Sequence, residues 1–210
     1  DQGLPVRQIF GQTETSIELW VPPEMAREKA GAVGLPVFHG EVQVVDPEGR
    51  PVRPGEIGEI VVRGPIQMLS YWNMPEETRE TIRDGWLHTR DLGRVDEEGF
   101  VYAVDRMGDM YISGGENVYP AEVEKVLLGH PKIYEAAIVG IPHPRWGKVG
   151  HAFIKPRQGM EITLDEVVSF LKDRVAAYKI PRSMEIIEEF PKTASGKIKK
   201  SELRKDIETP

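Results

Sequence analysis

The sequence predicts a mixed α/β protein, in which a barrel-like subdomain of short β-strands precedes a small α+β domain. Short apolar runs divided by turn residues fill the region before Asp105, and their spacing is typical of a small barrel or sandwich. After Asp105, helical and strand-like patterns alternate. The 21 glycines and 17 prolines agree with this division, because they favour many turns between short elements.

Turn residues mark the ends of the expected strands in the first region. Residues 4–20 predict a short strand followed by a polar loop at 11–16. Pro75, followed by two glutamates, predicts the start of a short helix, because proline suits the first helical position and acidic side chains suit the dipole there. Further strands, each next to a turn sequence, are expected at residues 42–45, 57–62 and 100–104.

Helical spacing is clearest in the second region. Val123, Val126 and Leu127 share one face of an expected helix over 119–128, which Gly129 ends. The remaining expected elements are strands at 136–141, 151–154 and 184–187, a helix that begins with a capping box at 163–166, and a closing helix at 201–207.

The composition excludes several classes of protein. The net charge of −7 argues against a nucleic-acid partner, which needs a clustered positive field, and we predict none. The absence of cysteine excludes a disulfide scaffold, a thiol nucleophile and a zinc site with cysteine ligands. No apolar run is long enough for a membrane span and no signal peptide opens the chain, so we predict a cytoplasmic protein.

Several polar segments carry side chains suited to nucleotide chemistry. In Phe10–Glu14, a hydroxyl suits a phosphate oxygen and a carboxylate suits magnesium. Asp91 could hold a ribose diol, since a carboxylate accepts two hydrogen bonds. The glycines in 113–117 allow a ligand to approach the backbone closely, and 191–197 presents a lysine on a loop. Taken singly, each segment also fits an ordinary polar turn or loop cap.

The order and spacing of these segments are more specific than any one of them. Together they resemble the adenylate-forming superfamily of acyl-CoA synthetases, luciferases and peptide-synthetase adenylation domains, over essentially all 210 residues. The most specific stretch is DRMGDMYISGGENVYPAEVE at 105–124, and PKTASGK at 191–197 follows at the distance that the family keeps.

The resemblance implies an enzyme that uses ATP and Mg²⁺ to convert a carboxylic acid into an acyl-adenylate and pyrophosphate, and then transfers the acyl group to CoA. It implies that Phe10 stacks on adenine, that Thr13 binds the α-phosphate and that Glu14 holds the magnesium ion. Asp91 would take both ribose hydroxyls, and Arg106 would contact the ribose or a phosphate.

The later motifs imply the remaining roles. Lys197 resembles the family's adenylation lysine, which bridges the substrate carboxylate and the nucleotide. The residues implied for CoA are Gly114, Gly115 and Glu116, which would line the pantetheine channel, together with Trp146 and Arg182.

The resemblance also implies a division into regions. Residues 1–34 would be a remnant of the large N-terminal adenylation domain, 35–105 a β-rich subdomain, and 106–210 a mobile C-terminal domain with a hinge near 107–109. In family members this last domain rotates between two poses, one for each half-reaction.

Two positions depart from the family pattern. Gly108 stands where Asp or Lys is usual at the hinge, and Arg90 stands where glycine commonly precedes the ribose-binding aspartate. Because glycine allows a wide range of backbone angles, we still expect rotation, but without polar control of the two poses.

One part of the expected active site is absent from the sequence. Family members carry a Ser/Thr/Gly-rich phosphate loop with a lysine upstream of the Phe10 segment, and this chain, which opens on Asp1 rather than Met, has none. We therefore expect a truncated chain that is inactive by itself and needs the missing N-terminal half as its partner. The expected substrate is a fatty or aryl carboxylic acid.

Competing interpretations remain. The run from Gly114 to Glu124 favours the acyl- or aryl-CoA synthetase branch over a peptide-synthetase domain. A fatty acyl-AMP ligase without CoA transfer and a non-catalytic binding or assembly module are the alternatives. The residues shared with the catalytic family favour the enzyme, because a module freed from catalysis could have lost any of them; they are Thr13, Glu14, Asp91, Arg106 and Lys197.

Overall fold

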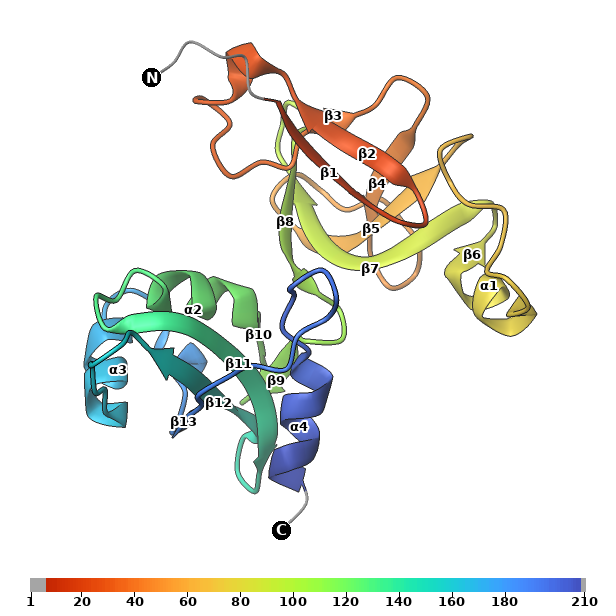
Figure 1. The fold of residues 1–210 in the computed structure, drawn as a ribbon. Coiled ribbons are helices and arrows are strands. Elements are labelled where there is room, and N and C mark those ends of the chain that lie inside the picture. Colours follow the sequence, from red (N-terminus) through yellow and green to blue (C-terminus); the bar gives the residue numbers. More distant parts are fainter. Residues whose placement is uncertain (1–6, 209–210) are drawn as a thin grey trace. The chain divides into compact units, whose positions relative to one another are not determined.

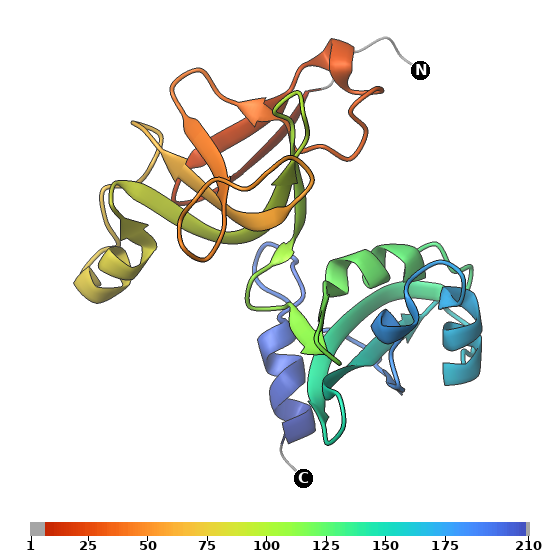
Figure 2. The same cartoon turned by 180° about the vertical axis from the view of Figure 1, so that it is seen from behind.

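The computed structural model describes residues 7–208 and divides the chain into two compact units, one up to Met107 and one from Gly108 onward. Figures 1 and 2 show the elements of both units from opposite sides. The expectations about Asp1 and about the start of the first strand lie outside the described residues.

The first unit contains two β-sheets. An antiparallel sheet joins β1 (Gln8–Gln12), β2 (Ser16–Val21) and β3 (Leu35–Pro36) in that order. The second sheet has five strands in the order β4-β5-β7-β6, with β8 paired to β7. Its strands are β4 (Glu41–Val45), β5 (Ile57–Arg63), β6 (Ile82–Arg83), β7 (Trp86–Val95) and β8 (Val101–Arg106). A 3₁₀ turn η1 (Pro23–Met25) and the helix α1 (Pro75–Thr81) complete the unit.

The two sheets share one hydrophobic core. Leu19 from β2, Val44 from β4, Ile60 from β5 and Val101 from β8 are buried together, and Phe10 from β1 packs against them. The strand-rich first region and the mixed α/β class predicted from the sequence are confirmed. The five-stranded sheet runs between distinct edge strands, β4 and β6, so among the described residues it is open rather than a closed barrel.

Four strands of this unit were missed by the sequence analysis: the two-residue strands β3 and β6, and the longer β2 and β7. The chain continues directly from the 13–15 turn into β2, whereas the prediction had a polar loop at 11–16 and no strand after it. The ten-residue β7 was not predicted as a strand, although it lies between β5 and β8. Its middle carries His88, Thr89, Arg90 and Asp91, whose polar side chains hide the period-2 alternation typical of a strand.

The second unit is an α+β domain built on a five-stranded sheet. The strand order is β10-β9-β12-β11, and β13 adds to β12 in parallel. The strands are β9 (Tyr111–Ser113), β10 (Glu116–Val118), β11 (Ile133–His143), β12 (Gly147–Pro156) and β13 (Ser183–Ile186). The helices are α2 (Pro120–Leu127), α3 (Leu164–Leu171), the 3₁₀ turn η2 (Ala177–Lys179) and α4 (Lys200–Glu208).

Helices cover both faces of this sheet. Ile138 of β11 is buried in a core with Val123 of α2 and Val167 of α3, whereas its neighbour Val139 is buried with Leu203 of α4. Successive residues of a strand point to opposite faces, so α2 and α3 lie on one face and α4 on the other (Figure 1). The predicted helices and strands of this domain are confirmed, with β11 and β12 longer than expected.

A pair of facing glycines shapes the centre of the sheet. Gly140 of β11 pairs with Gly150 of β12, and the ring of the buried Tyr111 lies over both. A Cβ atom added at Gly140 would lie 2.5 Å from the Tyr111 ring, and one at Gly150 would lie 2.6 Å from its hydroxyl oxygen. Both glycines are therefore required by packing.

None of the helices between residues 7 and 208 is long and apolar enough to cross a bilayer.

Candidate active site

The β1–β2 turn presents the first predicted site residues. Thr13 is exposed in this turn, and Glu14 beside it is half-buried. The Tyr71 hydroxyl donates a hydrogen bond of 2.7 Å to Glu14 Oε1, and the Met68 N–H donates one of 2.6 Å to the Glu14 carbonyl. Burial, and then the hydrogen bond to the Glu14 carboxylate, raise the pKa of Tyr71, so the phenol stays a donor at neutral pH. The Glu14 carboxylate is therefore held in one orientation.

Phe10 is less available than the sequence suggested. Its ring packs against the core of the first unit and is only partly exposed. A ligand could reach only the remaining part of the ring, so any stacking on adenine has to use that part.

Asp91 lies in an irregular part of β7. Leu92 pairs with Glu59 of β5, but the next pair joins His88 to Val61, so the three β7 residues 89–91 lie opposite one residue, Ile60. This is a β-bulge, a feature that re-aims side chains at functional sites. Arg90, in the middle of it, has a φ of 60°, in the left-handed region that non-glycine residues seldom adopt.

Arg106 and Asp91 form an ion pair at the bulge. Arg106 Nε donates a hydrogen bond of 2.8 Å to Asp91 Oδ1, and its guanidinium also reaches the Thr89 carbonyl at 3.3 Å. Beside this pair is a cavity of about 290 Å³ that Glu14, Tyr71 and Arg106 help to line. The structure thus places the residues predicted for magnesium and for the ribose or phosphate around one cavity of the first unit.

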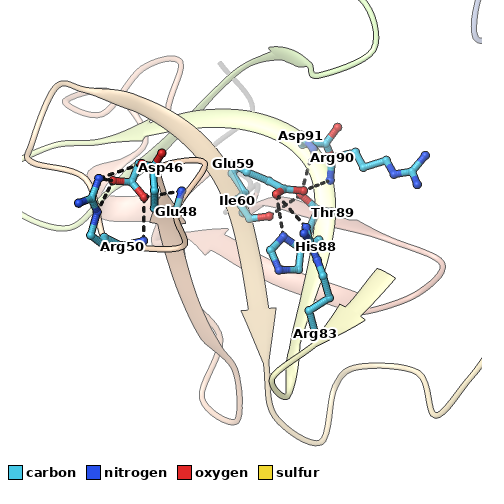
Figure 3. A network of polar contacts seen from close by, with 10 residues as sticks. All are labelled: Asp46, Glu48, Arg50, Glu59, Ile60, Arg83, His88, Thr89, Arg90 and Asp91. Atoms are coloured by element: carbon cyan, nitrogen blue, oxygen red, sulfur yellow. Dashed lines mark hydrogen bonds and ion pairs between the residues drawn. The ribbon is translucent and has the colours of Figure 1, made fainter. Parts of the chain in front are cut away.

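Glu59 was missed by the sequence analysis, although it holds the bulge. It is 9% exposed on β5. Its Oε2 is 2.7 Å from His88 Nδ1 and 3.8 Å from the Arg83 guanidinium, and its Oε1 accepts the Arg90 N–H at 3.1 Å (Figure 3). The available signal was a single acid inside the apolar run 57–62, but that run was interpreted only as a strand.

A second buried acid, Glu18, also escaped the sequence analysis. It is fully buried on β2, where Thr15 donates a hydrogen bond to Oε1 and Oε2 has no partner among the described residues. Burial raises the pKa of Glu18, and the nearby Asp91 and Glu14 carboxylates raise it further. Glu18 therefore takes up a proton more readily than an exposed glutamate.

The predicted CoA residues gather in the second unit. Gly114 and Gly115 form the two-residue turn between β9 and β10, with φ angles of 62° and 91° that favour glycine at both positions. The Gly114 N–H donates to the Trp146 carbonyl at 2.9 Å, and a Cβ atom at Gly114 would lie 2.9 Å from the Trp146 ring. The indole therefore packs directly on the first glycine.

Positive charge surrounds this tryptophan. The guanidinium of Arg145 lies 4.6 Å from the centroid of the Trp146 ring, and that of Arg182 lies 5.8 Å from it. A groove of about 610 Å³ runs past Gly115 and Trp146. Glu116 is exposed on β10 next to the turn. The structure thus brings Gly114, Gly115, Trp146 and Arg182 close together, and their role in CoA binding stays a prediction.

Lys197 ends a tight loop of the second unit. The Thr193 N–H donates to the Lys197 carbonyl at 2.8 Å, and the Lys197 N–H donates to Thr193 Oγ1 at 3.1 Å. Gly196 closes the loop with a φ of 83°. These bonds hold the backbone of Lys197 while its side chain is exposed.

The described residues contain no group of three or more His, Cys, Asp or Glu side chains able to hold a metal ion. Magnesium that accompanies a nucleotide needs no such group, since one or two carboxylates and the phosphates supply its oxygen ligands. Glu14, oriented by Tyr71 at the edge of the 290 Å³ cavity, fits that requirement.

Two family profiles match the chain. Residues 2–72 match the family described as AMP-binding enzyme, and residues 122–197 match the AMP-binding enzyme C-terminal domain. The chain belongs to the AMP-binding enzymes. It is thus a member of the adenylate-forming superfamily, in the acyl-CoA synthetase branch that the sequence resembled, and it matches the C-terminal portion of these proteins.

Curated relatives of this AMP-binding enzyme are CoA ligases. Over 206 residues the chain is 47% identical to a feruloyl-CoA synthase from Amycolatopsis sp., and over 208 residues it is 42% identical to a 2-succinylbenzoate–CoA ligase from Geobacillus kaustophilus. These matches cover 98% and 99% of the chain. The chain spans 42% of the length of each relative.

Solved structures of related enzymes have the same fold as this chain. The o-succinylbenzoate CoA synthetase from Bacillus subtilis, in complex with its acyl-adenylate intermediate, has a TM-score of 0.91 and 42% identity, over 97% of this chain and 42% of its own. An ATP-bound MatB from Rhodopseudomonas palustris has a TM-score of 0.89 and 34% identity, over 99% of this chain and 41% of its own.

Proposed function

We propose that this AMP-binding enzyme is the C-terminal part of an ATP-dependent acyl-CoA synthetase. The reaction joins a carboxylic acid and ATP to give acyl-AMP and pyrophosphate, and then transfers the acyl group to CoA with release of AMP. The substrate class is a fatty or aryl acid, and the site of action is the cytoplasm. The relatives that are CoA ligases support this proposal.

One observation of the structure carries the proposal furthest. Glu14, a carboxylate suited to magnesium, and Arg106, which is paired with Asp91, line the same cavity of the first unit. During adenylation, negative charge builds up on the α-phosphate, and a magnesium ion together with fixed cations stabilises it. Glu14 would hold that ion, Thr13 would bind the phosphate, and Asp91 would accept both ribose hydroxyls.

The second unit supplies the remaining groups of the proposal. Lys197 contributes the positive charge that bridges the substrate carboxylate and the nucleotide. The Gly114–Gly115 turn exposes backbone to the pantetheine arm, and Trp146 with Arg182 provides an aromatic, cationic surface for the nucleotide end of CoA. The hinge that we propose near 107–109 lets this unit serve both half-reactions.

The proposal also concerns the rest of the enzyme. The phosphate loop and most of the acyl pocket would belong to sequence that the relatives have and this chain does not contain. We therefore expect the 210 residues alone to form no acyl-AMP, and turnover by a homogeneous preparation of them would contradict this.

The test is release of AMP by the full-length protein with ATP, Mg²⁺ and a panel of fatty and aryl acids, with and without CoA. Release that needs both an acid and CoA is the expected result. Release without CoA would instead assign an acyl-AMP ligase, and no release with any acid would favour a non-catalytic module.

Replacing Lys197 tests the chemistry directly. Lys197→Ala is expected to lower acyl-AMP formation by about 100- to 1,000-fold, the usual effect of removing one transition-state donor. Lys199→Ala is the matched control, because Lys199 lies two residues further along and pairs with Glu202 at 2.9 Å. Equal rates for the two variants would remove Lys197 from the proposed mechanism.

A further inference from the structure

Glu59 is a buried carboxylate that none of the roles assigned above uses. It lies on β5 between apolar neighbours, next to the buried Ile60, and is 9% exposed. Removing a carboxylate from water is costly unless hydrogen bonds and opposite charges compensate. Both oxygens of Glu59 are compensated from β7 and from Arg83 of β6 (Figure 3), so the side chain joins strands rather than filling the core.

The contacts of Glu59 fall on the bulge that carries Asp91. A bulge leaves backbone groups without their ladder partners, and Glu59 Oε1 accepts one of them, the Arg90 N–H at 3.1 Å. The Thr89 hydroxyl binds two further backbone groups: it donates to the Ile60 carbonyl at 2.7 Å and accepts the Asp91 N–H at 3.1 Å. Side chains thus replace the missing sheet hydrogen bonds.

The backbone carbonyl of Arg90 is also held by a hydrogen bond. It accepts the Met107 N–H at 2.8 Å, so the N–H and the C=O of Arg90 are tied to β5 and to the end of β8. Arg90 keeps a φ of 60°, a conformation that costs a non-glycine residue energy and persists only where the surroundings impose it. Glu59 supplies the part of that constraint that comes from β5.

We infer that Glu59 is a positioning residue for nucleotide binding: its carboxylate, oriented by His88, fixes the Arg90 backbone and thereby the direction in which Asp91 presents its own carboxylate. The inference rests on the proposed role of Asp91 as the acceptor of the ribose hydroxyls. It adds a requirement that the sequence motif around Asp91 does not contain, namely an acid 32 positions upstream.

The experiment measures ribose recognition in the full-length protein without turnover. Calorimetric titration gives the dissociation constants for ATP and for 2′,3′-dideoxy-ATP, and their ratio reports the contribution of the ribose hydroxyls. In Glu59→Leu we expect the preference for ATP to fall by about tenfold, since hydrogen bonds to a charged group are involved, with affinity for dideoxy-ATP nearly unchanged. If the substitution merely disturbed the structure of the site, the binding of both nucleotides would weaken equally.

Two variants complete the design. Glu59→Gln is expected to keep the preference, because its amide oxygen still accepts the Arg90 N–H and its amide N–H can donate to His88. Glu41→Leu is the matched control, as Glu41 is an exposed acid on the edge strand β4 and forms an ion pair with Arg63 of β5, away from the bulge. An unchanged preference in folded Glu59→Leu would overturn the inference.

The remaining outcomes are equally decisive. If Glu59→Leu does not fold, His88→Phe replaces it, because that change removes the hydrogen bond that orients Glu59; an unchanged preference there would overturn the inference too. A wild-type protein that prefers ATP but adenylates no acid would contradict the proposed function and still allow this test. A wild-type protein that binds both nucleotides equally would overturn the role of Asp91 and this inference together.

Discussion

Tyr71 shows how a single residue far away in the sequence completes a motif. Glu14 belongs to the recognisable Phe10–Glu14 segment, but the hydroxyl that orients its carboxylate comes from a loop 57 residues later. That loop is itself closed by local bonds, in which the Tyr71 N–H donates to Thr78 Oγ1 at 3.0 Å and Thr78 Oγ1 donates to the Met74 carbonyl at 2.7 Å. Tyr71 is therefore a fixed donor rather than a mobile surface phenol.

Tyr71→Phe tests this at the residue scale. The change removes the hydrogen bond but keeps the ring, so we expect a higher Mg²⁺ requirement, by about tenfold, with an unchanged fold. The measurement is the rate of acyl-AMP formation by the full-length protein against Mg²⁺ concentration at saturating ATP. Tyr134→Phe, at an exposed position of β11, is the control. Identical Mg²⁺ curves for both variants would contradict the role.

At the scale of elements, helix α3 is the case in which local sequence and tertiary packing agree. Thr163 accepts the Glu166 N–H, and the Glu166 carboxylate accepts the Thr163 N–H at 2.9 Å, which is the predicted capping box. From that start, Val167 and Leu171 fall one turn apart and are both buried against the sheet. The local signal and the core contact point to the same helix.

Removing the cap tests its contribution. Thr163→Ala is expected to destabilise the second unit by about 1 kcal/mol, because the orphan N–H groups of the first turn lose their acceptor. Ser169→Ala, on the exposed face of the same helix, should cost nothing. Urea denaturation followed by circular dichroism compares them, and equal midpoints would show that the cap is dispensable.

At the scale of the whole molecule, the chain passes from the first unit to the second at Gly108, a residue with open space around it. Met107 is held in the first unit by its N–H bond to the Arg90 carbonyl, and Asp109 is held in the second by an ion pair of 2.5 Å with Arg204. Gly108 lies between them, and a Cβ atom added there would meet nothing within 4 Å. Its surroundings therefore support the hinge that we propose at 107–109.

Gly108→Pro tests the hinge. Proline restricts φ to about −65°, so we expect at most one of the two half-reactions to keep its rate, with the other reduced at least about tenfold. Single-turnover measurements on the full-length protein separate acyl-AMP formation from thioester formation. Gly108→Ala keeps more freedom and is the control. If both half-reactions keep wild-type rates in Gly108→Pro, the hinge lies elsewhere.

The sequence by itself determined what depends on neighbours along the chain. The capping box at Thr163, the glycine turn at 114–115 and the loop around Lys197 each depend on hydrogen bonds or φ angles within a few residues, and each could be read directly. The order of the motifs was also sufficient to identify the family and with it the candidate residues.

Only the tertiary structure decided how those residues are held. Strand β7 was hidden by the polar side chains of the bulge, whose partners are Glu59 on β5 and Arg106 on β8. Tyr71 likewise reaches Glu14 across 57 positions. Contacts between residues so far apart leave no period or spacing in the sequence, because they arise only when the strands pair and the loops close over them.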